Sequence, residues 1–204
     1  MHSRRPYMSA TERVIVILYT YSLKNEFRFK HIESINEYKM GTETTRFKNS
    51  WILWYHDPEN NDYSLNGYIR IADLSTPQQF WSVVDAIPKD AWECGMFFFM
   101  RDGFKPLWDS PENENGGSWS KKVDITNIQK IYIDLMVNCV TDDLLVKNKD
   151  SIAGITVSPK GQFSIIKIWN TSSSVHERSN LNAKIPMFQI GDDVTYTAHK
   201  SRRK

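Results

Sequence analysis

The sequence is poor in the residues that build cross-linked or reactive sites. Its two cysteines, Cys94 and Cys139, provide neither a disulfide framework nor a metal-binding spacing, so we expect buried thiols in a reducing compartment. The five histidines are scattered, and the chain lacks a Gly-rich phosphate loop, a His-Glu-x-x-His motif and a Gly-x-Ser-x-Gly elbow. These absences favour a binding protein over an enzyme and predict neither a metal nor another cofactor.

The sequence also lacks an excess of charge of one sign and a long hydrophobic run. Lysine and arginine number 26 against 24 acidic residues, a formal net charge of +2, so an anionic ligand must be held by a few placed cations rather than by a general field. The apolar run 14–18 is too short to cross a bilayer, and no small-residue cleavage site follows it. We therefore expect a cytoplasmic protein without membrane contact. Aromatic residues, in contrast, are abundant: 7 Trp, 9 Tyr and 10 Phe.

Short apolar runs separated by turn residues predict a single α+β domain with an antiparallel sheet and helices on one face. Helices are expected from residue 77 to about 87 and, capped by Asp124, from there to about 141. Residues 24–49 support no firm assignment. Strands are expected at 14–18, 51–55, 67–72, 95–100 and 118–123, in a hairpin of 152–157 with 163–169, and in a last short hairpin of 186–190 with 194–197.

The first predicted helix begins with a hydroxyl cap followed by Pro77 in its first turn. Phe80, Val84 and Ile87 form its inward stripe. Trp81 lies about 100° away from that stripe, on the side of Pro77, and is a candidate exposed aromatic.

The second predicted helix has a wide apolar stripe and, beside it, an additional apolar strip of Ile133, Val137 and Val140. A helix with one buried face does not need that strip. Either the helix lies in a wide groove, or the strip binds a partner.

Residues 104–119 hold two tryptophans, Trp108 and Trp119, around a segment with Pro111 and a Gly116-Gly117 pair that excludes a helix or central strand. Trp108 therefore sits in a loop beside the carboxylate of Asp109. It either covers the edge of a core or forms a stacking platform for a flat ligand whose edge donates to that carboxylate.

The second arm of the 152–169 hairpin places Ile165, Lys167 and Trp169 on one face, because side chains alternate along a strand. Lys167 beside Trp169 suits an anion attached to a flat ring, although an ordinary edge-strand lysine is the alternative. Guanine fits such a set of groups, since its N1 and 2-amino groups can both donate to one carboxylate. The positive charge of an N7-methylated guanine strengthens its stacking on tryptophan.

Taken together, five stretches resemble the eukaryotic translation initiation factor 4E family of mRNA cap-binding proteins: 51–55, 80–81, 102–109, 116–119 and 166–169. The resemblance covers about residues 45–198. It implies a curved eight-stranded antiparallel sheet with three helices on its convex face, and a function in translation initiation without enzymatic activity. We accordingly divide the chain into a variable N-terminal extension (1–45), a cap-binding domain (46–198) and a basic tail (199–204).

The resemblance assigns the cap base to a sandwich between two aromatic rings. Trp108 matches one of them, and Asp109 stands where the family usually has a glutamate that accepts from guanine N1 and N2. Trp169 matches the tryptophan that touches the N7-methyl group. No tryptophan occurs where the other ring of the sandwich falls, near residues 63–65, so Tyr63 is the candidate.

The expected phosphate site departs further from the family pattern. Lys160 stands at the usual arginine position, Ile165 stands at the usual lysine position, and Ser118 replaces another arginine. Lys167 is the candidate substitute. Two further candidates are Lys121 and Lys122.

On the convex face, the resemblance implies binding of a Tyr-x-x-x-x-Leu-hydrophobic helix from a 4G-type scaffold factor or a 4E-binding protein. Trp81, Ile133 and Val137 match the family's contact residues, and Pro77 stands where valine is common. The departures indicate a divergent member, such as those of kinetoplastid protists, whose caps carry additional methyl groups. A cap-binding repressor that does not support initiation is the alternative role. A cap hydrolase or a general single-strand RNA binder fits less well.

Overall fold

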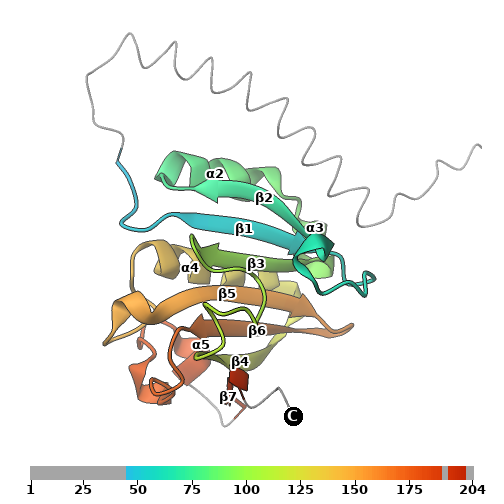
Figure 1. Cartoon of the computed structure of the whole chain (residues 1–204). Helices are drawn as coiled ribbons and strands as arrows, with labels where there is room; N and C mark the ends of the chain where they lie inside the picture. Colours follow the sequence, from blue (N-terminus) through green and yellow to red (C-terminus); the bar gives the residue numbers. More distant parts are fainter. Residues whose placement is uncertain (1–44, 190–192, 201–204) are drawn as a thin grey trace, which may run out of the picture.

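The computed structural model describes residues 45–189 and 193–200, apart from the side chain of residue 150. In this part of the chain, seven strands form one curved antiparallel sheet in the order β2-β1-β3-β5-β6-β4-β7, and helices cover one of its faces (Figure 1). The strand expected at 14–18 lies outside the described residues. The strands are β1 (Trp51–His56), β2 (Tyr68–Leu74), β3 (Met96–Arg101), β4 (Gly117–Asp124), β5 (Ile152–Pro159), β6 (Phe163–Asn170) and β7 (Thr195–Ala198).

The described residues form four α-helices, against the three expected: α2 (Pro77–Ala86), α3 (Lys89–Cys94), α4 (Ile128–Val140) and α5 (Pro186–Gln189). The predicted start of α2 is confirmed by a capping box, in which the Thr76 hydroxyl accepts from the Gln79 N–H at 3.2 Å and the Gln79 side chain accepts from the Thr76 N–H at 3.1 Å. Asp124 caps a single 3-10 turn, so α4 begins only at Ile128.

The last predicted hairpin is wrong. Pro186–Gln189 forms the short helix α5, whose Phe188 is fully buried, and β7 pairs with β4, where Tyr196 lies opposite Trp119. A segment of four or five residues is too short for its period to be read, and a proline at its start suits the first turn of a helix as well as it suits an edge strand.

The core lies on both faces of the sheet because side chains alternate along each strand. On the helix-side face, Trp51 stacks on Phe99 with ring centroids 4.9 Å apart, beneath residues of α2 and α4. On the opposite face lies a second group, here called the loop-side cluster. It consists of Ile52, Trp54, Met96, Phe98, Met100, Ala153 and Trp169.

The loop between β3 and β4, residues 102–116, crosses this second face in front of β5 and β6 (Figure 1). Phe104 and Trp108 of the loop pack against the loop-side cluster, as does Tyr68 of β2. All six residues of β1 are buried, which is the two-sided coverage that its continuous apolar run predicts.

The helices present the faces expected from their periodicity. Phe80, Val84 and Ile87 are buried, whereas Trp81 is 49% exposed. On α4, the hydroxyl of Tyr132 lies 3.1 Å from the carbonyl oxygens of residues 97 and 155, which fastens the helix to β3 and β5. Burial raises the pKa of that hydroxyl well above its ordinary value, so it remains a donor.

The two cysteines differ in their surroundings. Cys139 is buried in α4, where burial raises the pKa of its thiol, but Cys94 at the end of α3 is exposed, so the expectation of burial is wrong for Cys94. Across the described ranges, no helix combines the length and the apolar composition needed to span a membrane.

Candidate functional site

The loop 102–116 is organised around Asn113, a residue that sequence reasoning missed. Its side chain is fully buried, and its amide nitrogen lies 2.8 Å from the carbonyl oxygens of Lys105 and Leu107. The Glu112 carboxylate accepts from the Lys105 N–H at 3.1 Å. Partial burial is the largest single influence on the pKa of Glu112 and raises it, but the hydrogen bonds from the backbone of residues 112 and 105, with smaller contributions, outweigh burial and lower the pKa. These bonds fold the segment that carries Trp108 back onto the sheet.

The end of the loop is held by residues far along the chain. The Gly117 N–H donates to the Asn170 side-chain oxygen at 2.9 Å, and the His199 N–H donates to the Gly116 carbonyl at 2.9 Å. A Cβ at Gly116 would lie 1.9 Å from the Asn170 carbonyl oxygen, so the Gly-Gly pair is needed for this close approach.

The side chain of His199 also fastens loop 102–116. Its Nδ1 lies 2.8 Å from the Asn113 carbonyl oxygen, and because a carbonyl only accepts, Nδ1 carries the hydrogen. The ring is 1% exposed and stands edge-on to Trp169, with centroids 5.0 Å apart. Sequence reasoning had placed His199 in the basic tail.

Trp108 is half-buried: part of its ring covers the loop-side cluster and part is exposed. The two interpretations of this tryptophan are therefore compatible. The adjacent Asp109 is exposed and close enough to act electrostatically on Tyr68. Burial, with smaller contributions from Tyr63, Asp109 and Asp62, raises the pKa of Tyr68 to about 12.

Tyr63, the candidate for the other stacking ring, is 55% exposed in the segment between β1 and β2. Its ring stacks on His56 with centroids 4.6 Å apart and an interplanar angle of 9°. His56 also contacts Tyr68, with centroids 4.7 Å apart, so Tyr63 and Tyr68 share one neighbour. Trp108 and Tyr68 pack on the same loop-side cluster, and Tyr63 and Asp109 both act electrostatically on Tyr68.

The strand register decides which amines belong to this face. On β4 and β6, Lys167 lies opposite Ser120 and Ile165 lies opposite Lys122. Lys167 is half-buried and shares its face with Trp169, as predicted, and the Lys122 amine lies 3.9 Å from the centroid of the Phe163 ring.

Lys121 does not belong to this face. It lies between Trp119 and Val123, both in the helix-side core, and its amine is 2.6 Å from the Asp193 carboxylate. Lys160 is exposed at the turn between β5 and β6. Lys122 and Lys167 thus share the loop-side face, which also carries the guanidinium of Arg70, 5.6 Å from the centroid of the Trp54 ring.

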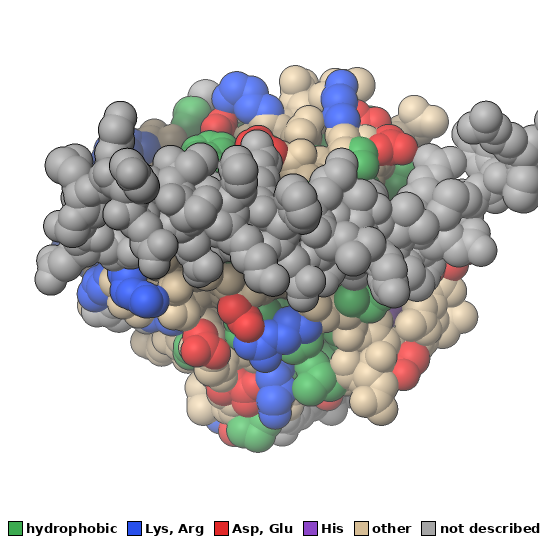
Figure 2. Space-filling model, turned by 90° about the horizontal axis from the view of Figure 1, so that it is seen from above, with side chains coloured by type: hydrophobic (Ala, Val, Ile, Leu, Met, Phe, Trp, Pro, Cys, Tyr) green, Lys and Arg blue, Asp and Glu red, His purple; other side chains and the backbone are tan. Residues whose placement is uncertain are grey.

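This face carries aromatic rings that can stack on a flat molecule, a carboxylate that can accept from its edge and cations that can pair with an anion. Within residues 45–189 and 193–200, no group of three His, Cys, Asp or Glu side chains could hold a metal ion. Acidic and basic side chains are interspersed on the side seen in Figure 2, which views the molecule from above the α2 and β2 edge. On the loop-side face, Lys122, Lys167 and Arg70 supply positive charge for a negatively charged group.

The second predicted site lies on the helix side. Trp81 of α2 stands edge-on to Phe80 with centroids 5.1 Å apart, and Ile133 and Val137 of α4 are half-buried, as is Pro77 at the start of α2. The structure thus leaves all four predicted partner-binding residues accessible on the helix-covered face.

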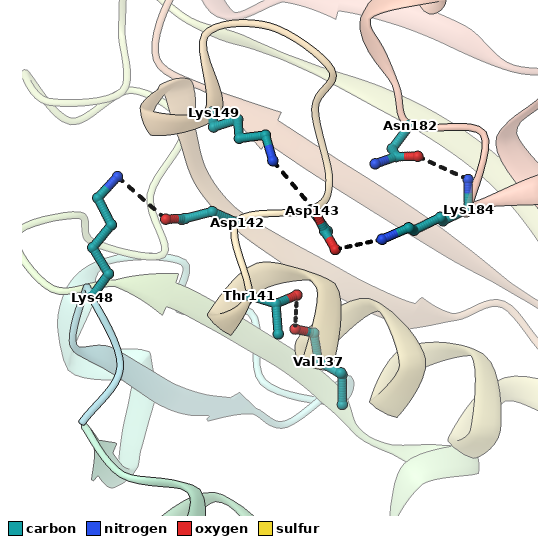
Figure 3. Close-up of polar contacts among 8 residues, drawn as sticks. All are labelled: Lys48, Val137, Thr141, Asp142, Asp143, Lys149, Asn182 and Lys184. Atoms are coloured by element: carbon teal, nitrogen blue, oxygen red, sulfur yellow. Dashed lines mark hydrogen bonds and ion pairs between the residues drawn. The ribbon is translucent and has the colours of Figure 1, made fainter. Parts of the chain in front are cut away.

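Ion pairs fix the C-terminal end of α4 (Figure 3). Asp142 pairs with Lys48 at 3.3 Å, and Asp143 pairs with Lys184 at 2.8 Å and Lys149 at 3.4 Å. Hydrogen bonds from Lys184 and then Lys149 lower the pKa of Asp143. These contacts connect α4 to the segment before β1 and to the segment before α5.

Comparisons with known sequences agree on one family. The profile described as "Eukaryotic initiation factor 4E" matches residues 46–204. The chain is 27% identical over 178 residues to eukaryotic translation initiation factor 4E-1 of Caenorhabditis elegans, an alignment that covers 77% of this chain and 82% of that protein. It is 30% identical over 146 residues to eukaryotic translation initiation factor NCBP of Triticum aestivum, covering 69% of this chain and 61% of the wheat protein, less than two thirds of its length.

Solved structures show the same fold. C. elegans eIF4E-3, solved in complex with the 4E-binding protein Mextli and a cap analog, superposes with a TM-score of 0.65 at 22% identity, covering 78% of this chain and 95% of that one. Ascaris suum eIF4E-3 in complex with an m7G cap gives a TM-score of 0.66 at 19% identity, covering 77% of this chain and 92% of the Ascaris chain. Its complex with an m2,2,7G cap gives 0.65 at 20% identity, covering 78% and 93%.

Proposed function

Because the chain belongs to the eukaryotic initiation factor 4E family, we propose that it binds the 7-methylguanosine cap of mRNA on the loop-side face of its sheet. The observation that carries the proposal is that Trp108 and Tyr68 pack on one loop-side cluster, with Asp109 and Tyr63 both near enough to Tyr68 to act on it electrostatically. The relatives solved with m7G and m2,2,7G caps support it and extend the ligand class to caps with additional methyl groups.

Each residue has a separate role in the proposed complex. Tyr63 and Trp108 stack on the two faces of the charged base, and Asp109 accepts from its N1 and 2-amino groups. Trp169, which is 4% exposed, contacts the N7-methyl group at the bottom of the site. Lys160 and Lys167 bind the phosphates. The hydrogen bonds of Asn113 bring Asp109, one methylene shorter than glutamate, to the base.

The helix-covered face is the proposed site for a second partner. Trp81, Ile133 and Val137, with Pro77 at the edge, present an accessible apolar strip that suits the apolar residues of an amphipathic helix. Such a helix would come from a 4G-type scaffold or from a 4E-binding protein, and the relative solved with Mextli supports this class of partner.

The protein would act in the cytoplasm as a non-enzymatic translation factor, with residues 46–198 as its cap-binding domain and 1–45 as a variable extension. Recruitment of a scaffold to the capped mRNA would promote initiation. A cap-binding repressor is the second candidate, favoured by Pro77 at the first position of α2, where its ring alters the surface beside Trp81.

Titration with m7GTP and with GTP tests cap binding directly. We expect m7GTP to quench tryptophan fluorescence far more strongly than GTP, and Trp108→Ala to weaken m7GTP binding by about 5- to 150-fold, since one base stack contributes about 1–3 kcal/mol. Trp81→Ala is the matched control, because it removes an accessible indole from the other face. Equal quenching by the two nucleotides would contradict recognition of the methylated cap.

A peptide with the Tyr-x-x-x-x-Leu-hydrophobic sequence tests the second partner. We expect wild-type protein and Trp108→Ala to capture the peptide and Trp81→Ala to lose it. A protein that binds m7GTP but captures no such peptide would favour the repressor role over initiation.

A further inference from the structure

The segment between β1 and β2 that carries Tyr63 is folded by its own side chains. The Asp57 carboxylate accepts from the Glu59 N–H at 3.0 Å, the Asn60 oxygen accepts from the Asp62 N–H at 2.9 Å, and the Asp62 carboxylate accepts from the Ser64 N–H at 2.9 Å. Such turns shape a loop locally. They do not fix where the loop lies relative to the sheet.

His56, the last residue of β1, makes that connection. Its side chain is fully buried, and its Nε2 lies 3.0 Å from the Asp62 carbonyl oxygen. Because a carbonyl only accepts, Nε2 carries the hydrogen in this bond. The same ring stacks nearly parallel on Tyr63 and contacts Tyr68 on the sheet. One imidazole therefore holds both the backbone of the segment and its aromatic side chain.

Gly67 leaves the space that the Asp62 carbonyl occupies next to it. A Cβ at residue 67 would lie 1.8 Å from the Asp62 carbonyl oxygen, the atom to which His56 donates. The segment can approach the sheet only because residue 67 has no side chain. Asp62 is thus held between a buried donor and a position that tolerates only glycine.

We propose that His56 is a positioning residue that holds Tyr63 ready to stack on the cap before the cap arrives. The proposal rests on the proposed cap-binding function. His56 covers one face of the tyrosine ring, while the ring as a whole remains 55% exposed and able to stack on a second ring. A tyrosine already oriented loses less conformational freedom on binding, and the apparent affinity rises with the fraction of protein in the competent conformation.

A double-mutant cycle tests the role of His56, with m7GTP affinity measured by tryptophan quenching and folding by thermal melting. If His56→Leu leaves Tyr63 correctly placed about one fifth of the time, affinity falls about fivefold. His56→Phe preserves ring stacking but not the hydrogen bond to the Asp62 carbonyl, and should recover only part of that loss. In the Tyr63→Ala background, which by itself weakens binding about tenfold or more, His56→Leu should have no further effect.

Gly67→Ala provides a second variant that leaves β1 intact. It displaces the Asp62 carbonyl, so we expect it to weaken m7GTP binding and to lose that effect in the Tyr63→Ala background. Wild-type affinity in His56→Leu, or additive losses with Tyr63→Ala, would overturn the role of His56 while leaving cap binding in place. Absence of m7GTP binding by the wild-type protein would overturn the proposed function itself.

Discussion

Replacing Asn113 with alanine should detach loop 102–116 from the loop-side face while the sheet remains folded. The amide donates at 2.8 Å to the carbonyls of Lys105 and Leu107. Each hydrogen bond contributes about 1 kcal/mol, and each acceptor left buried without a donor costs about 1–3 kcal/mol. Water can reach the exposed Lys105 more easily than the half-buried Leu107, so we expect a total loss of about 2–3 kcal/mol in loop stability.

Two measurements follow from this estimate. Urea denaturation of Asn113→Ala should show a lower free energy of unfolding than wild type, and m7GTP affinity should fall by up to about 30- to 150-fold, the factors that correspond to about 2 and 3 kcal/mol. Asn115→Ala is the matched control, because this exposed side chain lies in the same loop and surface substitutions usually change stability by less than about 0.5 kcal/mol.

The reasoning would be refuted if Asn113→Ala bound m7GTP within twofold of wild type. Asn113→Asp sharpens the test because it keeps the shape of the side chain and replaces the donor with a carboxylate facing two carbonyls. It should weaken binding at least as much as alanine does. A fully active Asn113→Asp protein would mean that packing, not hydrogen bonding, positions Trp108.

Two further predictions concern charged residues. Lys167→Met should weaken binding of m7GTP but not of the 7-methylguanosine nucleoside in parallel titrations, because Lys167 is a proposed phosphate ligand, whereas Lys121→Met should change neither, because Lys121 faces the helix side. Asp143→Asn should destabilise the fold near neutral pH, because hydrogen bonds from Lys184 and Lys149 lower the pKa of Asp143 and favour its charged form. That stabilisation is present above the ordinary carboxyl pKa of about 3.9 and is lost as the pH falls through the lowered pKa of Asp143. Urea titrations should therefore show that the free energies of unfolding of wild type and Asp143→Asn become more similar in acid. A constant difference at all pH values would contradict this assignment.

Several elements could be predicted because their sequence pattern is local. A threonine hydroxyl at position 76 followed by Pro77 predicts the start of α2. The alternation of side chains in residues 163–169 predicts that Lys167 lies beside Trp169. Alternation along 118–123 also predicts which of the adjacent residues Lys121 and Lys122 faces the helix side. Since Trp119 and Val123 face the helix-side core, Lys121 must face it too and Lys122 must face away.

Other features depend on contacts between distant parts of the chain. Asn113 lies in a segment rich in Asn, Glu and Gly, a composition typical of a solvated loop, and nothing local indicates that its side chain is buried. His56 ends an apolar strand, and its role becomes visible only when the following segment folds back over it. The helix α3 occupies only six residues, too few for its period to be read between Pro88 and Gly95.

The hydrogen bond from His199 to Asn113 joins residues separated by 86 positions. A ribosome therefore synthesises α2 and α4 well before it delivers His199, the residue that fastens loop 102–116. A chain trimmed just before β7 would retain α5 and its buried Phe188 but lose His199, so under the proposed function we expect weaker m7GTP binding with Trp81 still exposed. If the chain binds a scaffold and a cap as proposed, such a shortened protein would occupy the scaffold without bringing a message to it, and so would compete with the intact protein.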